Sequence, residues 1–112
     1  MDCLFCSIIN GDIPSKKVYE DDCCYAFYDI NPQAPVHFLV VPKLHISSAD
    51  AVSVENSKYV SHIFEVIPKI ANELGLSQGY RIITNIGENG CQSVKHLHFH
   101  VLGGKKLSEN MA

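Results

Sequence analysis

The sequence lacks the features that mark a membrane or nucleic-acid partner. It has no apolar run that approaches the roughly 20 residues of a membrane-spanning helix. It has no cluster of lysines and arginines, and its formal net charge is −3, so electrostatics does not favour polyanion binding. We therefore expect neither a membrane nor a nucleic acid as a partner, whereas a small anionic ligand is compatible with the charge.

Repeats, low-complexity tracts and linkers are also missing. The 112 residues are enough for one hydrophobic core, so we expect a single domain over residues 1–112. An acid stands near the N-terminus where a signal peptide carries positive charge, so we expect no secretion signal. The five cysteines are an odd number, which favours reduced thiols and a cytoplasmic or nuclear location over a disulfide framework.

The hydrophobic pattern that is present predicts an antiparallel sheet with one main helix, an α+β domain. Alternating or continuous apolar runs predict the strands, and glycine and proline mark the turns between them. The expected elements are a short helix at 4–10, a hairpin at 18–29, a loop at 31–35, and strands at 37–41, 80–85 and 96–102.

The main helix is expected over 58–74, with Gly75 at its end. Its apolar residues recur at spacings of three and four, which places them on one face. Pro68 lies inside this pattern, and we expect it to kink or divide the helix near Phe64. The apolar positions are Val60, Ile63, Phe64, Ile67, Ile70, Ala71 and Leu74.

Three histidines alternate with apolar residues in the segment His96-Leu97-His98-Phe99-His100-Val101-Leu102. Because successive side chains of a strand point to opposite faces, the three imidazoles are expected to share one face, with neighbours about 6.5–7 Å apart. An exposed face would ordinarily carry Thr, Lys or Glu, so packing alone gives no reason for this pattern. Three groups that titrate near neutral pH on one rigid strand favour catalysis.

A metal site is compatible with a different set of residues. His96 and His100 would lie about 13 Å apart on a strand, too far to share one ion. Cys3-x-x-Cys6 has the spacing of half a zinc site, and with His45 and His96 it would make a Cys₂His₂ site. The alternative is that both cysteines are small buried hydrophobic residues, and spacing alone does not decide between the two.

If His96 is a metal ligand, His98 is the candidate nucleophile. An imidazole attacks phosphorus readily, and the phosphoramidate it forms is reactive enough to hydrolyse. The loop at 89–93 and the glycine pair at 103–104 suit close approach of the backbone to a phosphate. This arrangement favours phosphoryl chemistry.

Through most of its length the chain resembles the histidine triad (HIT) superfamily, and in particular its nucleotide-binding (Hint) branch. Beside the triad itself, the resemblance rests on the stretches 5–9, 13–15, 19–22, 29–37, 41–45, 79–81 and 90–94. It implies a HIT-like five-stranded antiparallel sheet with one main helix and a short N-terminal helix. It also implies a homodimer in which two sheets join into one of ten strands.

The resemblance further implies a phosphoramidase that hydrolyses the P–N bond between an AMP or GMP group and an amine, through a covalent nucleotidyl-histidine. By position, His98 is the nucleophile, and His100 binds phosphate and assists proton transfer, with His37 nearby and Ser93 completing the catalytic set. The implied nucleotide-binding residues are Phe5, Ile8, Phe27 and Leu39 at the base, Asp29 and Ile30 at the ribose, and Asn85, Gln92, Ser93, His98 and His100 at the phosphate and leaving group.

Zinc is the implied metal, and no organic cofactor is implied. Members of the superfamily with an N-terminal Cys-x-x-Cys, including the related galactose-phosphate uridylyltransferases, bind structural zinc through these cysteines, a later histidine and the first histidine of the triad. The matching positions here are Cys3, Cys6, His45 and His96.

The chain departs from the family pattern in two places. It contains no tryptophan, so it lacks the Trp-Pro-Pro-Gly segment that relatives often carry, and Cys91 stands where they often have glycine.

The third triad residue is His100 rather than glutamine, which favours a hydrolase over a nucleotidyltransferase. The alternatives are a dinucleoside polyphosphate hydrolase, which the Gly-Gly ending disfavours, and a nucleotide-binding scaffold or sensor dimer with incidental hydrolysis.

Overall fold

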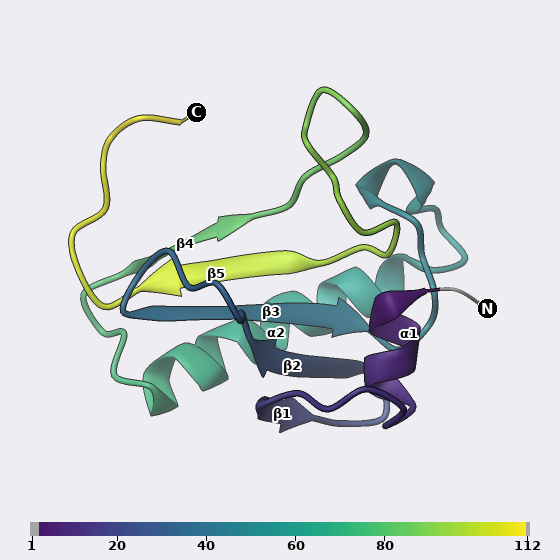
Figure 1. Cartoon of the computed structure of the whole chain (residues 1–112), viewed down its shortest axis with the longest axis horizontal. Helices are drawn as coiled ribbons and strands as arrows, with labels where there is room; N and C mark the ends of the chain where they lie inside the picture. The colour runs from purple at the N-terminus through teal and green to yellow at the C-terminus, as the bar shows by residue number, and fades with distance from the viewer. Residues whose placement is uncertain (1–2, 112) are drawn as a thin grey trace.

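A computed structural model describes residues 3–111, which form a five-stranded antiparallel sheet with a helix on each face (Figure 1). The strand order is β1-β2-β3-β5-β4, and every neighbouring pair is antiparallel. The expected α+β class, the single sheet and both helices are confirmed. The elements are α1 (Leu4–Ile9), β1 (Lys17–Glu20), β2 (Cys24–Tyr28), β3 (Val36–Pro42), the 3-10 helix η1 (Ala49–Ala51), α2 (Ser57–Glu73), β4 (Tyr80–Ile83) and β5 (Phe99–Gly103).

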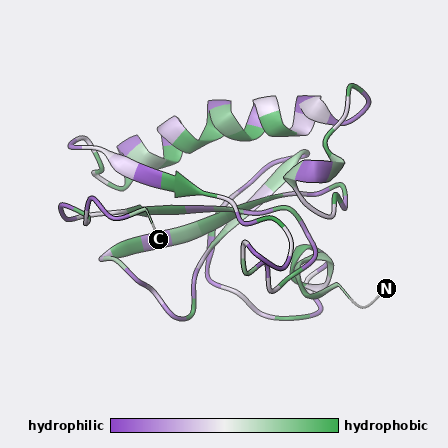
Figure 2. Ribbon diagram, turned by 90° about the horizontal axis from the view of Figure 1, so that it is seen from above, coloured by the Kyte–Doolittle hydropathy of each residue, from purple (hydrophilic) through white to green (hydrophobic). Residues whose placement is uncertain are grey.

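The central strand β3 is buried on both faces because a helix covers each side of the sheet. Phe38 and Val40 point toward α2, whereas Leu39 and Val41 point toward α1. Seen from above, α2 lies along one face and the N-terminal segment lies below the other (Figure 2). The continuous apolar run of this strand in the sequence follows from this double cover.

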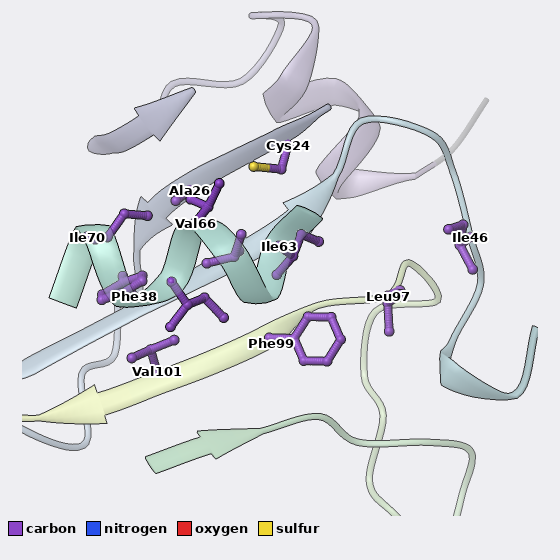
Figure 3. Close-up of a cluster of buried hydrophobic side chains, with 12 residues drawn as sticks. Cys24, Ala26, Phe38, Ile46, Ile63, Val66, Ile70, Leu97, Phe99 and Val101 are labelled. Carbon is purple, nitrogen blue, oxygen red and sulfur yellow. The ribbon is translucent and has the colours of Figure 1, made fainter. Parts of the chain in front are cut away.

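The larger core lies between α2 and the sheet (Figure 3). Ile63 and Ile67 are fully buried there against Phe38 and Val101. Full burial of each such side chain contributes about 1.5–3 kcal/mol, so this face holds the helix in place. No helix among residues 3–111 has the length and apolarity to cross a membrane.

Helix α2 is continuous through Pro68, so the expected division near Phe64 is wrong, whereas the alternative expectation of a kink stays a prediction. Pro68 lies on the exposed face, where the carbonyl group of Phe64 that loses its partner can bond to water. The buried face supplies the compensating stability. Phe64, which the periodicity predicts on the apolar face, is 46% exposed, whereas Val66, outside the predicted set, is buried.

The last strand is shorter than expected, because its pairing begins only at Phe99. The partner strand β3 ends at Pro42, which has no N–H to donate to a longer ladder. Other groups satisfy the backbone before Phe99: the amide of Leu97 donates to the carbonyl of Ile46 at 2.6 Å, and the carbonyl of His98 accepts from Thr84. The alternation of side chains nevertheless continues, because Leu97 joins the core under α2.

Candidate functional site

A cavity of about 290 Å³ opens between α1 and the histidine-bearing side of the sheet. It shares Phe27 and Asp29 with a second cavity of about 750 Å³, which extends to the loop at 31–35 and to His37. Most of the predicted nucleotide-binding residues meet in the smaller cavity. They are Phe5, Ile8, Phe27, Asp29, Ile30, Leu39, Asn85, Ser93, His98 and His100.

The tautomer of His98 follows from its hydrogen bond to the backbone. Its Nδ1 lies 2.7 Å from the carbonyl oxygen of His96, which can only accept, so Nδ1 carries the proton. In the neutral ring, the lone pair is therefore on Nε2. The ring packs edge-on against Phe5, at 5.0 Å between centroids, and lies 5.1 Å from the ring of His100. This geometry presents an unprotonated ring nitrogen from a side chain that is held on three sides.

Thr84 holds the backbone that carries His98. Its Oγ1 donates to the carbonyl oxygen of His98 at 2.8 Å, directly after β4 ends at Ile83. This contact is not among the sequence predictions, because Thr84 lies inside the strand predicted at 80–85. A hydroxyl residue in such an apolar run can form a bond of this kind, but only the pairing of β4 with β5 identifies its partner.

His37, His100 and Asp29 form a polar cluster beside the smaller cavity. His37 Nε2 lies 2.9 Å from His100 Nδ1 and 3.5 Å from Asp29 Oδ2. Burial lowers the pKa of His37, and the charge of Asp29 opposes this shift. Burial, with the adjacent His98 and His37, lowers the pKa of His100 to about 4. Both imidazoles are therefore neutral at pH 7.

The loop that leads into the triad is braced by Gln92. Its side-chain amide donates to the carbonyl oxygens of Ser47 and Val94, at 2.7 and 3.0 Å, and its Oε1 accepts from the amide of Gly87. Gln92 is buried and lines neither of these two cavities, and the contacts of its side chain order the loop. Its predicted phosphate contact stays a prediction.

Cys91 has a backbone conformation that normally favours glycine. Its φ is 59°, the one positive value at a non-glycine position among residues 3–111. The side chain is exposed and lines the smaller cavity. The backbone of Cys91 is therefore in the left-handed region, and its thiol adds bulk to the cavity wall.

Cys3, Cys6, His45 and His96 meet beside α1, as predicted for a metal site, and their four ligand atoms lie within 4.8 Å of one another. The distances from His96 Nδ1 are 3.3 Å to Cys3 Sγ, 3.6 Å to Cys6 Sγ and 3.1 Å to His45 Nδ1. Ligand atoms of a tetrahedral Zn²⁺ site lie about 3.3–3.8 Å apart, given its bond lengths. The four residues therefore fit such an ion.

The second nitrogen of His96 supports the same fit. Nε2 donates to the carbonyl oxygen of Pro42 at 2.9 Å, which leaves the lone pair on Nδ1, toward the two thiols. Hydrogen bonding of this kind typically orients a metal-ligating histidine. The one contact thus fixes both the ring orientation and the nitrogen that is free to bind.

A further cluster of Asp21, Cys23 and His62 is a structural brace. Asp21 Oδ2 accepts from His62 Nε2 at 2.6 Å and from the hydroxyl of Tyr19 at 2.8 Å. Its Oδ1 accepts from the amides of Cys23 and Cys24. Partial burial raises the pKa of Asp21, but these hydrogen bonds outweigh it and hold the pKa well below its usual range. Protein donors occupy both oxygens, so the cluster links the β1–β2 hairpin to α2.

Residues 10–107 match the HIT domain family. Three solved structures are similar to nearly the whole chain. A histidine triad protein from Clostridium difficile is 56% identical, with a TM-score of 0.95, and the match covers 98% of this chain and 96% of that one. A HIT family hydrolase from Clostridium thermocellum is 41% identical, with a TM-score of 0.95 and coverage of 99% and 97%. A histidine triad nucleotide-binding protein from Candida albicans is 33% identical, with a TM-score of 0.82 and coverage of 99% and 87%.

Proposed function

The chain belongs to the HIT family, and from this premise we propose that it is a purine nucleoside phosphoramidase. It would hydrolyse the P–N bond between a nucleoside monophosphate and an amine through a covalent intermediate on His98. The observation that carries the proposal is the hydrogen bond from His98 Nδ1 to the carbonyl of His96, because it places the lone pair of the neutral ring on Nε2, in a side chain that lines the cavity. The similar proteins named as a hydrolase and as nucleotide-binding support the same general reaction and ligand.

The cavity walls suit the parts of a nucleotide. The aromatic rings of Phe5 and Phe27, 5.5 Å apart, give an apolar surface for a base. The carboxylate of Asp29 can accept from ribose hydroxyls, although its Oδ1 already accepts from the amide of Asn31 at 2.8 Å. Ser93 lines the same cavity as His98, where a phosphate would lie.

The proposed reaction has two steps at phosphorus. In the first, His98 Nε2 forms a bond to phosphorus while the P–N bond to the amine breaks, and the leaving nitrogen takes a proton from solvent. In the second, the oxygen of a water molecule bonds to phosphorus, the bond to His98 breaks, and the electron pair returns to Nε2. The water releases one proton to solvent, so the two steps sum to hydrolysis.

Replacement of the nucleophile tests the proposal. We expect His98→Asn to lower turnover of an AMP–amine phosphoramidate at least about 10³-fold, since the covalent route is lost. Nucleotide binding should remain measurable. His62→Asn is the matched control, because it changes a histidine of the α2 brace outside the cavity. Wild-type turnover by His98→Asn would refute the proposed nucleophile.

Two further measurements define the reaction. Mass spectrometry of a reaction quenched without acid should find a nucleotidyl group on the peptide that contains His98. A substrate panel of phosphoramidates, dinucleoside polyphosphates and nucleotidyl sulfates separates the alternatives. Preference for polyphosphates would indicate the dinucleoside polyphosphate hydrolase, and no turnover of any of them would indicate a nucleotide-binding scaffold.

We also propose a structural zinc ion on Cys3, Cys6, His45 and His96. The converging ligand atoms and the oriented imidazole of His96 support it. The ion would cross-link the first turn of α1 with its N-cap, the loop after β3 and the segment before β5. It would take no part in the chemical steps.

A homodimer is the third proposal. The strand order leaves β4 at one edge of the sheet, where its Ile83 is 37% exposed. Phe64 of α2 is 46% exposed and packs edge-on against Phe99 of β5, the neighbour of β4. Pairing of two such edges would bury these side chains. Light scattering should then give twice the chain mass of 12.4 kDa.

A further inference from the structure

We propose that the backbone amide of Gln33 sets the tautomer of His100 through His37, and so makes His100 a fixed, neutral hydrogen-bond donor in the cavity. His37 is then a positioning residue that acts through His100. The inference deepens the proposed function, on which its catalytic meaning rests. It assigns His100 the task of holding a phosphoryl oxygen and not that of delivering a proton to the leaving amine.

The first link is the contact between Gln33 and His37. The amide nitrogen of Gln33 lies 3.1 Å from His37 Nδ1 and donates to it. A backbone amide has no acceptor capacity, so Nδ1 must hold a lone pair. His37 is 5% exposed, which excludes water as a competing partner for most of its surface. The proton of the neutral His37 ring is therefore on Nε2.

The second link joins His37 to His100. The protonated Nε2 of His37 lies 2.9 Å from His100 Nδ1, whereas Asp29 Oδ2 is farther, at 3.5 Å. His37 therefore donates to His100 Nδ1, which must hold a lone pair in turn. The proton of His100 is then on Nε2, which has no hydrogen-bond partner among residues 3–111 and belongs to a side chain that lines the cavity.

The same chain of contacts resists a second proton on His100. That proton would sit on Nδ1 and would face the N–H of His37. The neighbouring groups are His98, His37 and Asp29, and of these only the carboxylate of Asp29 favours a charged ring, from 3.9 Å away. Burial and the neighbouring His98 and His37, which lower the pKa of His100 to about 4, likewise oppose a second proton. His100 thus keeps one proton, on a fixed nitrogen, across the neutral range.

His98 and His100 consequently offer a ligand opposite hydrogen-bonding groups, an acceptor and a donor. His98 presents the lone pair of Nε2, because its Nδ1–H is used by the carbonyl of His96. His100 presents Nε2–H, because its Nδ1 is used by His37. A donor that is fixed before the reaction needs no reorganisation in the transition state, and loss of one such donor typically costs about 10²–10³ in turnover.

Histidine ¹⁵N NMR of the unmodified protein tests the relay without any substrate. At pH 7 we expect proton-bearing Nε2 and bare Nδ1 in both His37 and His100. The pattern for His100 should not change between pH 6 and 8. A proton on His100 Nδ1 at pH 7 would overturn the inference.

Two variants of His37 separate positioning from packing. His37→Leu removes the donor, so we expect His100 to take a proton on Nδ1 toward Asp29 and its titration to move up toward the ordinary range. Turnover should fall about 10²-fold, with a shifted pH profile and little change in KM. His37→Gln keeps an amide N–H that can reach His100, and should retain the tautomer and most of the turnover.

The outcomes distinguish the relay from the function. An unchanged His100 tautomer in His37→Leu, with native amide spectra, would refute the relay even if the phosphoramidase is real. The expected tautomers in a protein that turns over no phosphoramidate would refute the proposed function and leave the relay intact. Equal effects of the leucine and glutamine variants would assign His37 a packing role only and overturn the proposal.

Discussion

At the scale of single residues, the three histidines of the triad differ because each meets a different neighbour. His96 donates from Nε2 to the carbonyl of Pro42, and His98 donates from Nδ1 to the carbonyl of His96. His100 accepts at Nδ1 from His37. Three histidines at one spacing thereby take different roles: His96 is a candidate metal ligand, His98 a candidate nucleophile and His100 a candidate hydrogen-bond donor. Ring chemistry alone does not make this division.

Cys91 carries a testable backbone strain. A non-glycine residue in the left-handed region costs about 1 kcal/mol, whereas glycine adopts this region freely. We expect Cys91→Gly to be more stable than Cys91→Ala by about 0.5–1 kcal/mol, because both lose the thiol and only alanine keeps the Cβ atom. Thermal unfolding of the two variants measures this difference. Equal stability would show that the position carries no strain.

At the scale of elements, tertiary packing overrides local preference in two places. Helix α2 passes through Pro68 because its buried face, with Ile63, Val66 and Ile67, outweighs one lost backbone bond. Strand β5 begins late because Pro42 removes a donor from the partner strand. Helix α2 is therefore longer than a helix that ends at its proline, and β5 is shorter than the strand predicted at 96–102.

The brace between the β1–β2 hairpin and α2 gives a prediction for acid stability. Since the pKa of Asp21 is lowered in the folded chain, the carboxylate stabilises the fold above its ordinary pKa of about 3.8, and this stability is lost as the pH falls further. Asp21→Asn cannot accept from both Tyr19 and His62 through its amide nitrogen, and should cost about 1–2 kcal/mol at pH 7.

Denaturant unfolding of wild type and Asp21→Asn from pH 7 to pH 2 checks this brace. The difference in the free energy of unfolding should be constant near neutral pH and should shrink progressively below pH 4. Asp22→Asn is the matched control, since Asp22 is exposed on the same turn. A difference that is as large at pH 2 as at pH 7 would contradict the electrostatic origin of the effect.

At the scale of the whole molecule, the two faces of the sheet have separate tasks. The face under α2 holds a purely hydrophobic cluster with Phe38, Phe99 and Val101. The opposite face holds the second cluster under α1, the candidate metal residues and the candidate nucleotide cavity. The stability of the sheet and the chemistry of the site therefore depend on different sets of side chains.

A zinc ion would connect the N-terminal segment to this second face. We expect about one zinc per chain in protein purified without added metal, and a fall in Tm of more than about 10 °C after a strong chelator removes it. His45→Ala should lose zinc, while Cys23→Ala, which changes a thiol outside the quartet, should keep it. Zinc-free protein with unchanged Tm after chelation would refute the site.

Much of the candidate site can be predicted from the amino-acid sequence. The period-two alternation placed Leu97, Phe99 and Val101 on one face, and these three do lie in the core. The family resemblance predicts one nucleotide site from residues far apart in the sequence, and four of them line one cavity: Phe5, Asp29, Asn85 and His98. These features depend on local periodicity and on motif identity, which a sequence records directly.

Tertiary structure alone decided the hydrogen bonds that give each group its state. The amide of Gln33, the carbonyl of Pro42 and the hydroxyl of Thr84 are generic groups, so no residue pattern marks them as partners of His37, His96 and His98. Their roles depend on where loops and strand ends meet in space, to within a few tenths of an ångström. The sequence by itself determined which chemical groups are present and on which face they lie, while folding determined which ring nitrogens keep a lone pair, because a proton's position depends on contacts between distant segments.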